Sequence, residues 1–196
     1  MIDMLRGATL ELRVGDPMEL RTDVGPVIDA QAQQLIEEHT NRMRREGRLL
    51  SKASLNPDLT NGHFVAPQIY EIDRLDQLER EVFGPILHVI RYKKSELQDV
   101  LADIRASSYG LTLGIHSRID GFAQTVFENT EVGNTYINRN TVGAVVGVNP
   151  FGGQGLSGTG PKAGGPHYLY RFVWEKTRTD NVVAKGGNTD LFTLQE

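Results

Sequence analysis

The chain has 196 residues, of which 39% are hydrophobic and 23% charged, and its formal net charge is −4. This composition predicts one globular domain, and the interspersed charges give no electrostatic footprint for nucleic acid or an anionic membrane. No apolar run approaches the ~20 residues of a membrane span, and the N-terminus does not match a signal peptide. We therefore expect a cytoplasmic protein with no membrane span and no nucleic-acid partner on this segment.

The absence of cysteine limits the chemistry that the chain can perform. Disulfides, thiolate zinc sites and a cysteine nucleophile are all excluded, because the sequence contains no cysteine. The five histidines form no pair at metal-ligand spacing, so we predict no metal site. No serine lies in a nucleophile elbow and no paired carboxylates indicate hydrolysis. No catalytic residue is therefore predicted on this chain.

Two helices are predicted near the N-terminus. The first is defined by apolar residues at helical spacing: Ile2, Leu5, Ala8 and Leu12. The second spans residues 30–46, with Asp29 as its capping residue and Gly47 at its end. Its apolar stripe is predicted to contain Ala32, Leu35, Ile36, His39 and Met43. Because His39 lies on this apolar face, we interpret it as a core histidine.

Strands and helices then alternate along the chain. Strands are predicted at 48–53, 64–72, 86–92, 111–117 and 132–138. The helix after residue 95 is predicted to be capped by Ser95 and to bury Leu97, Val100, Leu101 and Ile104. The next helix is predicted to be capped by Asp120 and to bury Ala123, Val126 and Phe127. This alternation implies right-handed crossovers, so the predicted fold class is α/β, with a parallel sheet and flanking helices.

A glycine-rich loop follows from Asn138 to Pro166 and contains nine of the 21 glycines. A long loop in a compact domain is usually functional or disordered, and the apolar elements on both sides favour function. Residues 153–158 match the pattern G-x-G-x-x-G, but prolines on both sides oppose the strand and helix of a dinucleotide fingerprint. We interpret these glycines as positions that need a positive φ. The tail, residues 172–196, is predicted to be an extended hairpin that turns at Gly186-Gly187-Asn188.

The first candidate binding motif is Glu81-Val82-Phe83-Gly84-Pro85, directly before a predicted buried strand. Ligands of α/β sheets bind at strand ends. A carboxylate there can accept hydrogen bonds from two ribose hydroxyls, and Phe83 can pack on a planar ring. The alternative is a solvated Glu81 with a core Phe83 at a turn, and spacing alone favours this alternative.

The second candidate is the run of small residues 141–147, whose backbone N–H groups can cradle a carboxylate. Arg139 and Lys162 are nearby in sequence. The alternative is a plain surface loop with solvated basic residues, which the loop by itself favours.

These residues resemble the aldehyde dehydrogenase superfamily from about Gly15 to Trp174. The resemblance rests on four motifs in the family's order: Glu81 to Pro85, Tyr109-Gly110-Leu111-Thr112, Gly133 to Asn138, and Pro150-Phe151-Gly152-Gly153. Within that superfamily, residues 138–140, 142–165 and 186–188 resemble the pyrroline-5-carboxylate dehydrogenase domain of bacterial proline utilisation A proteins. The resemblance implies NAD-dependent oxidation of L-glutamate γ-semialdehyde to glutamate.

The resemblance also implies a role for each matched position. Glu81 would hold the nicotinamide ribose of NAD, with Phe83 beside it. Gly143 and Ala144 would supply amides for the α-carboxylate of the substrate, and Phe151 would line its aliphatic stem. Residues 1–171 would be part of the catalytic domain. Residues 172–196 would be an oligomerisation flap in a homo-oligomer.

In the family, the catalytic Cys, the general-base Glu, the oxyanion Asn and the Rossmann-type domain precede the part that matches here. We therefore expect a C-terminal fragment that is inactive alone and pairs with those missing segments. FAD is compatible with the parent protein but has no site on this chain. The alternatives are a non-catalytic oligomerisation or regulatory piece, and a related aldehyde dehydrogenase with another substrate. We also expect exposed apolar edges to cause aggregation or obligate association.

Overall fold

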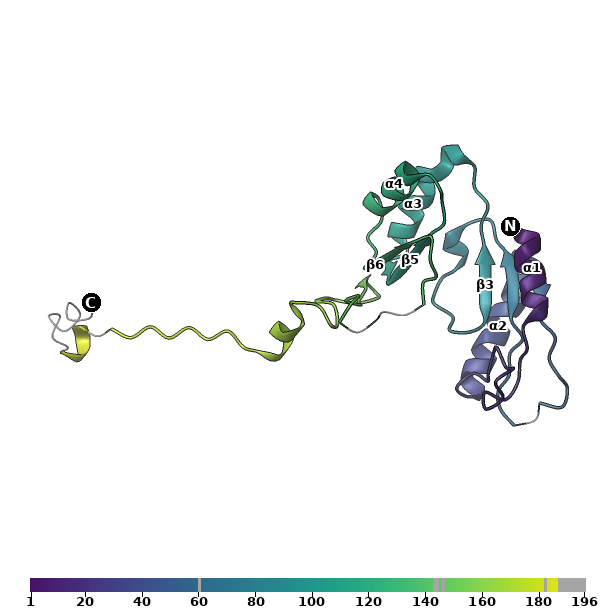
Figure 1. The fold of residues 1–196 in the computed structure, drawn as a ribbon, viewed down its shortest axis with the longest axis horizontal. Helices are drawn as coiled ribbons and strands as arrows, with labels where there is room; N and C mark the ends of the chain where they lie inside the picture. Colours follow the sequence, from purple (N-terminus) through teal and green to yellow (C-terminus); the bar gives the residue numbers. More distant parts are fainter. Residues whose placement is uncertain (60, 143–144, 146, 182, 187–196) are drawn as a thin grey trace.

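The computed structural model describes residues 1–59, 61–142, 145, 147–181 and 183–186. The fold is mixed α/β, and its helices and strands form two groups (Figure 1). After Phe172 the chain extends away from both groups. None of the helices in the described ranges is long and apolar enough to cross a membrane.

The first group is a three-stranded sheet with a helix on each face. Its elements are α1 (Ile2–Glu11), α2 (Ala30–Glu46), β1 (Arg48–Lys52), β2 (Gln68–Glu71) and β3 (Ile86–Val89). The strand order is β1-β2-β3, with β1 antiparallel and β3 parallel to β2. The Ser51 hydroxyl donates to the Arg6 carbonyl of α1 over 3.4 Å, whereas the Tyr70 hydroxyl on the other face lies 3.5 Å from the Thr40 carbonyl of α2. The two helices therefore cover opposite faces.

The second group is a parallel strand pair covered by two helices. Its elements are α3 (Leu97–Ala106), β5 (Thr112–Ile115), α4 (Asp120–Glu128) and β6 (Asn134–Ile137), and its core contains Leu101, Ile115, Ala123 and Val126. A short antiparallel pair, β4 (Tyr109–Gly110) with β7 (Gln154–Gly155), lies beside it. Four 3₁₀ turns complete the described elements: η1 (Leu75–Gln77), η2 (Lys94–Glu96), η3 (Tyr168–Phe172) and η4 (Val183–Lys185).

The prediction of an α/β fold is confirmed, but the prediction of one parallel sheet is wrong. The described strands form three small sheets, and only the pairs β2–β3 and β5–β6 are parallel. The connection from β1 to β2 contains no helix, so the chain returns antiparallel instead of crossing over. The strands are also shorter than predicted, since residues 64–67 are buried without pairing as a strand.

Three helix details test the predicted capping. Asp29 caps α2 as predicted, because its carboxylate accepts from the Ala32 N–H at 2.7 Å. Ser95 does not cap α3, since it lies within η2 and the Glu96 carboxylate accepts from the Lys93 N–H at 2.8 Å instead. Asp120 is the first residue of α4 and makes no capping bond. The first of these predictions was wrong because the turn η2 precedes α3, and the second because α4 already includes Asp120.

Three residues of the predicted apolar stripes are exposed: Ala8 on α1, Leu35 on α2 and Phe127 on α4. Leu35 is 37% exposed and Phe127 is 52% exposed. Leu35 directly precedes the buried Ile36, and Phe127 directly follows the buried Val126. One step along a helix turns the side-chain direction by about 100°, so Leu35 and Phe127 are directed away from the core. On α2, Thr40 is buried although Leu35 is exposed. On α4, Phe122 packs against the core although Phe127 is exposed.

The predicted hairpin in the tail is not confirmed. Between Val173 and Gly186, the described residues contain the turn η4 and no strand. The turn predicted at residues 186–188 lies largely outside the described residues. Large apolar side chains are exposed in η3 and at the start of this tail, among them Leu169, Tyr170, Phe172, Val173 and Trp174.

We predict that Met43→Ala lowers the free energy of unfolding by about 2–5 kcal/mol, because Met43 is 0% exposed and its loss leaves a cavity. The matched control is Met4→Ala on α1, where the side chain is 75% exposed and the change should stay within about 0.5 kcal/mol. Urea denaturation followed by circular dichroism measures both. Equal losses in the two variants would contradict the packing described for α2.

Candidate functional site

The segment that carries Glu81 runs from η1 to β3 and lies against α2. Gly84 is the point of closest approach, because a Cβ on this residue would lie 2.5 Å from the Cδ1 of Ile36. Ile36 is only 1% exposed and is enclosed in the core. A larger residue at position 84 would therefore push the segment away from the helix. The glycine of the motif is explained by packing.

Glu81 lies at the rim of a cavity of about 540 Å³. The cavity is lined by the η1 segment, by the end of α3, by Tyr109 of β4 and by two residues that follow β7, Leu156 and Ser157. The Glu81 N–H lies 3.4 Å from the Tyr109 hydroxyl, which is in position to accept it. No described group donates a hydrogen bond to the Glu81 carboxylate. It is therefore free to accept hydrogen bonds from a ligand with hydroxyl groups.

Phe83 points away from the core and is 85% exposed. The alternative of a core phenylalanine at this turn is therefore wrong. Phe83 does not line the cavity beside Glu81. Its ring has a free face for a planar group, but the contact with a cofactor remains a prediction.

The four motifs are joined by one chain of hydrogen bonds. Tyr109 contacts Glu81, and the carbonyl of the next residue, Gly110, accepts from the Gly133 N–H at 3.0 Å. The Asn134 side chain donates to the Pro150 carbonyl at 3.1 Å and accepts from the Gly152 N–H at 3.2 Å. Asn134 is buried, so these bonds are shielded from water. Motifs separated by up to 70 positions in the sequence therefore form one connected unit.

The glycines of the long loop permit backbone contacts. A Cβ on Gly133 would lie 1.9 Å from the Gly152 carbonyl oxygen, so the two segments touch backbone to backbone. Gly155 and Gly158 have φ values of +60° and +156°, and described residues after them form no helix until past Gly165. The interpretation of the G-x-G-x-x-G match as a loop is confirmed, and the positive φ is confirmed at Gly155 and Gly158 but not at Gly153.

Of the three predicted substrate residues, the structure describes Phe151. Gly143 and Ala144 lie outside the described residues. Phe151 is half-buried and exchanges two backbone hydrogen bonds with Ala163, of 3.0 and 2.9 Å. The two basic residues near the loop have local partners: Lys162 donates to the Gly133 carbonyl, and the Arg139 guanidinium lies 4.8 Å above the Tyr136 ring.

His39 is buried as predicted, but it has a partner that the pattern did not indicate. Its Nε2 lies 2.9 Å from Nε2 of His88 on β3, and the rings meet edge to face. Burial lowers the pKa of His88 from 6.5 to about 4, with smaller contributions from His39 and Arg42. Burial also lowers the pKa of His39, assisted by Arg42 and Arg80 and opposed by Glu46. Both rings are therefore neutral near pH 7, which leaves a ring nitrogen to accept the hydrogen bond between them.

Several site residues escaped the sequence reading. Tyr109, Asn134 and Ser157 act through backbone contacts whose partners are far away in sequence. Tyr109 and Asn134 lie inside motifs, which was the available signal. Gln77 and His88 had no signal, because one is a polar residue in a loop and the other a single histidine in a strand.

We predict that Gly133→Ala lowers the free energy of unfolding by at least about 2 kcal/mol, because neither backbone segment can yield to the new Cβ. In Gly121→Ala the added Cβ meets nothing within 4 Å inside α4, so stability should rise by about 0.5 kcal/mol. Thermal unfolding measures the stability of both variants, and amide exchange within residues 150–153 measures the local effect of Gly133→Ala. A tolerated Gly133→Ala would contradict the backbone contact.

Comparison with known proteins agrees with the four-motif unit. A model of the aldehyde dehydrogenase family matches residues 1–178. The chain is 54% identical to the bifunctional protein PutA of Klebsiella aerogenes over 177 residues, which are 88% of this chain and 14% of that protein. It is 37% identical to 1-pyrroline-5-carboxylate dehydrogenase of Geobacillus thermodenitrificans over 171 residues, 86% of this chain and 32% of that protein. The chain thus spans less than a third of the length of either relative.

Solved structures share the fold. A point mutant of proline utilization A from Bradyrhizobium japonicum gives a TM-score of 0.86 at 54% identity, over 95% of this chain and 19% of that chain. The 1-pyrroline-5-carboxylate dehydrogenase from Thermus with bound NAD gives a TM-score of 0.77 at 34% identity, over 87% of this chain and 33% of that chain. The matched residues and the shared fold together establish that this chain belongs to the aldehyde dehydrogenase family.

Proposed function

We propose that the chain is the C-terminal part of the catalytic domain of an NAD-dependent L-glutamate γ-semialdehyde dehydrogenase. The identity of 54% to PutA over 88% of the chain is the observation that carries this proposal. The hydrogen bonds that connect all four motifs support it, because the matched residues are also neighbours in space. The parent reaction oxidises the aldehyde to the carboxylate of glutamate.

In this proposal Glu81 binds the ribose next to the nicotinamide. The exposed carboxylate at the rim of the 540 Å³ cavity fits such a ligand, since two adjacent hydroxyls can donate to its two oxygens. Phe83 offers an exposed ring face beside it. When bound, NAD supplies the hydride acceptor. The chain contributes one part of the cofactor site, and we assign FAD no residue here.

The substrate would be anchored by the loop after β6. Gly143 and Ala144 would donate amides to the α-carboxylate, and Phe151 would pack against the aliphatic stem. The hydrogen bonds from Asn134 to Pro150 and Gly152 support this arrangement, because they fix Phe151 in place between them. Only an aldehyde that bears a carboxylate needs such an anchor, which favours glutamate semialdehyde over other aldehydes.

The remaining parts of the reaction would come from segments outside this chain. With no cysteine, the chain has no thiol to attack the aldehyde, so upstream segments of a parent protein must supply the nucleophile. We further propose that residues 172–196 are an association flap of a homo-oligomer. The exposed Phe172, Val173 and Trp174 support this role, because apolar residues clustered at a surface favour contact with a partner.

The second candidate is a non-catalytic oligomerisation or regulatory piece. The missing thiol and the exposed apolar tail favour it. The two candidates differ in what Glu81 does, since a purely structural piece has no need for a free carboxylate at the cavity.

We predict that the purified 196-residue chain forms no NADH from glutamate semialdehyde and NAD, because no thiol is present to form the covalent intermediate. Absorbance at the NADH band measures this directly, with a complete relative as the positive control. Turnover above background would overturn the proposed division of roles.

A chimera tests the cofactor contact. Residues 1–178 replace the matching segment of the Klebsiella aerogenes PutA, and we expect this protein to oxidise glutamate semialdehyde with NAD. Glu81→Gln in the chimera should raise the KM for NAD about tenfold, because a hydrogen bond to a charged group contributes roughly 1.5–3 kcal/mol. The matched control is Glu37→Gln on the exposed side of α2. An unchanged KM in Glu81→Gln would favour the non-catalytic candidate.

A further inference from the structure

One face of α2 lies along the whole segment that presents Glu81. Starting from the N-terminal side, Ile36 contacts Gly84 and His39 pairs with His88. One turn later, Met43 belongs to a buried cluster against which Leu78 and Ile86 pack. These positions on α2 recur every three or four residues, so they form one stripe of the helix. The stripe therefore contacts the segment on both sides of Glu81.

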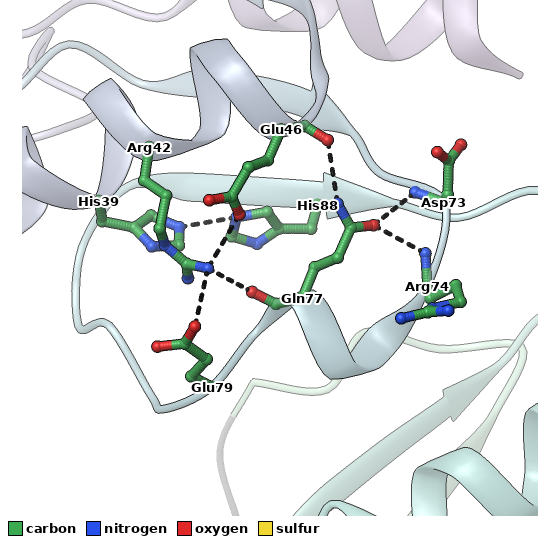
Figure 2. Close-up of polar contacts among 8 residues, drawn as sticks. All are labelled: His39, Arg42, Glu46, Asp73, Arg74, Gln77, Glu79 and His88. Carbon is green, nitrogen blue, oxygen red and sulfur yellow. Dashed lines mark hydrogen bonds and ion pairs between the residues drawn. The ribbon is translucent and has the colours of Figure 1, made fainter.

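Arg42 and Gln77 form the polar end of this contact (Figure 2). The Arg42 guanidinium donates to the Gln77 carbonyl at 2.9 Å and lies 3.5 Å from the Glu79 carboxylate. The Gln77 amide donates to the Glu46 carbonyl at 2.9 Å, where it satisfies a carbonyl near the end of α2. Its oxygen accepts from the N–H groups of Asp73 and Arg74, both at 2.9 Å. One side chain thus ties the helix end to the start of the Glu81 segment.

The histidine pair closes the other end. Figure 2 shows His39 from α2 meeting His88 from β3, two residues after the strand begins. The hydrogen bond between the rings forms only while at least one ring is neutral, because a neutral ring nitrogen must accept it. Two charged rings therefore cannot form this bond. Three charged groups act on the pair electrostatically: Arg42, Arg80 and Glu46. Six others line a cavity together with His88: Asp73, Arg74, Arg91, Glu96, Asp99 and Asp103.

We propose that Gln77, Arg42 and the His39–His88 pair are positioning residues for the cofactor contact. They hold residues 77–88 on α2 and thereby fix where the Glu81 carboxylate is presented. The inference rests on the proposed function of Glu81. It adds that α2 sets the position of the Glu81 carboxylate, and that the contact of Glu81 with the cofactor weakens when the histidine pair is protonated.

Amide exchange in the full 196-residue chain tests the mechanical part. In Gln77→Ala the Glu81 N–H, the amide of residues 79–85 with a described acceptor, should exchange about tenfold faster, because three hydrogen bonds are lost at one end of the segment. The matched control is Gln34→Ala, where the amide contacts only the Glu38 carboxylate on the same helix. Protection in α3 and α4 should not change in either variant. Unchanged exchange of the Glu81 N–H in Gln77→Ala would overturn the proposal.

Gln77→Glu serves as the milder variant, should the alanine variant unfold. Its carboxylate still accepts from Asp73 and Arg74, and only the donor to the Glu46 carbonyl is removed. Faster exchange of the Glu81 N–H in a chain that retains protection in α3 and α4 supports the positioning role. Full protection overturns it.

The pH dependence follows from the lowered pKa values. A histidine with a pKa lower in the folded state binds fewer protons when folded, so its contribution is complete above about pH 6.5 and is lost as pH falls toward 4. Exchange of the Glu81 N–H, corrected for the intrinsic rate, should therefore accelerate over this range. His88→Gln keeps a side chain that can bond to His39 but removes the ring with the lower pKa, so the acceleration should shrink. An identical pH profile in both proteins would contradict the role of the pair.

The KM for NAD in the chimera separates this proposal from the function on which it rests. If positioning matters, Gln77→Ala raises the KM for NAD in the same direction as Glu81→Gln, while the KM for the aldehyde changes little. Leu101→Ala, in the other core, should lower the amount of active protein without changing the KM for NAD. A raised KM in Glu81→Gln alone overturns positioning. An unchanged KM in Glu81→Gln overturns the ribose contact, whatever the exchange of the Glu81 N–H shows.

Discussion

Backbone segments approach each other at Gly133 and Gly152 more closely than any side chain would permit, and the arrangement of the motifs depends on that approach. A Cβ on Gly133 would lie 1.9 Å from the Gly152 carbonyl oxygen. Asn134 can bond to Pro150 and Gly152 only because its neighbour leaves this space open. Through these contacts the long loop returns to β6 and, by way of Gly110 and Tyr109, reaches Glu81. The glycines of the family motifs are thus explained by contact between segments.

The sequence predicted elements well where a helical period or an apolar run decides the structure. The bounds of α2 and the Asp29 cap follow directly from local pattern. The number of sheets did not follow, because strand pairing depends on partners that are distant in sequence, and β1 pairs antiparallel where a crossover was expected. Exposure was misjudged at Leu35 and Phe127, where one step around a helix separates the core from solvent.

The candidate site was predictable in its motifs and less so in what supports them. Glu81 and Phe83 were found because they lie in a recognisable run before a strand. The residues that hold this run, Gln77 and the His39–His88 pair, are separated from their partners by 31 to 49 positions. Such contacts leave no periodic signal, so only a folded structure reveals them. The roles of Gly143 and Ala144 rest on resemblance alone.

The two groups of helices and strands have separate hydrophobic cores, one around Met43 and Tyr70 and the other around Leu101 and Ile115. No described strand of one group pairs with a strand of the other. Because the two cores share no buried residue, we expect them to act as distinct units of local unfolding. Damage to one core therefore need not spread to the other. The Glu81 cavity lies where η1 meets α3, so it exists only while both units are folded and in contact.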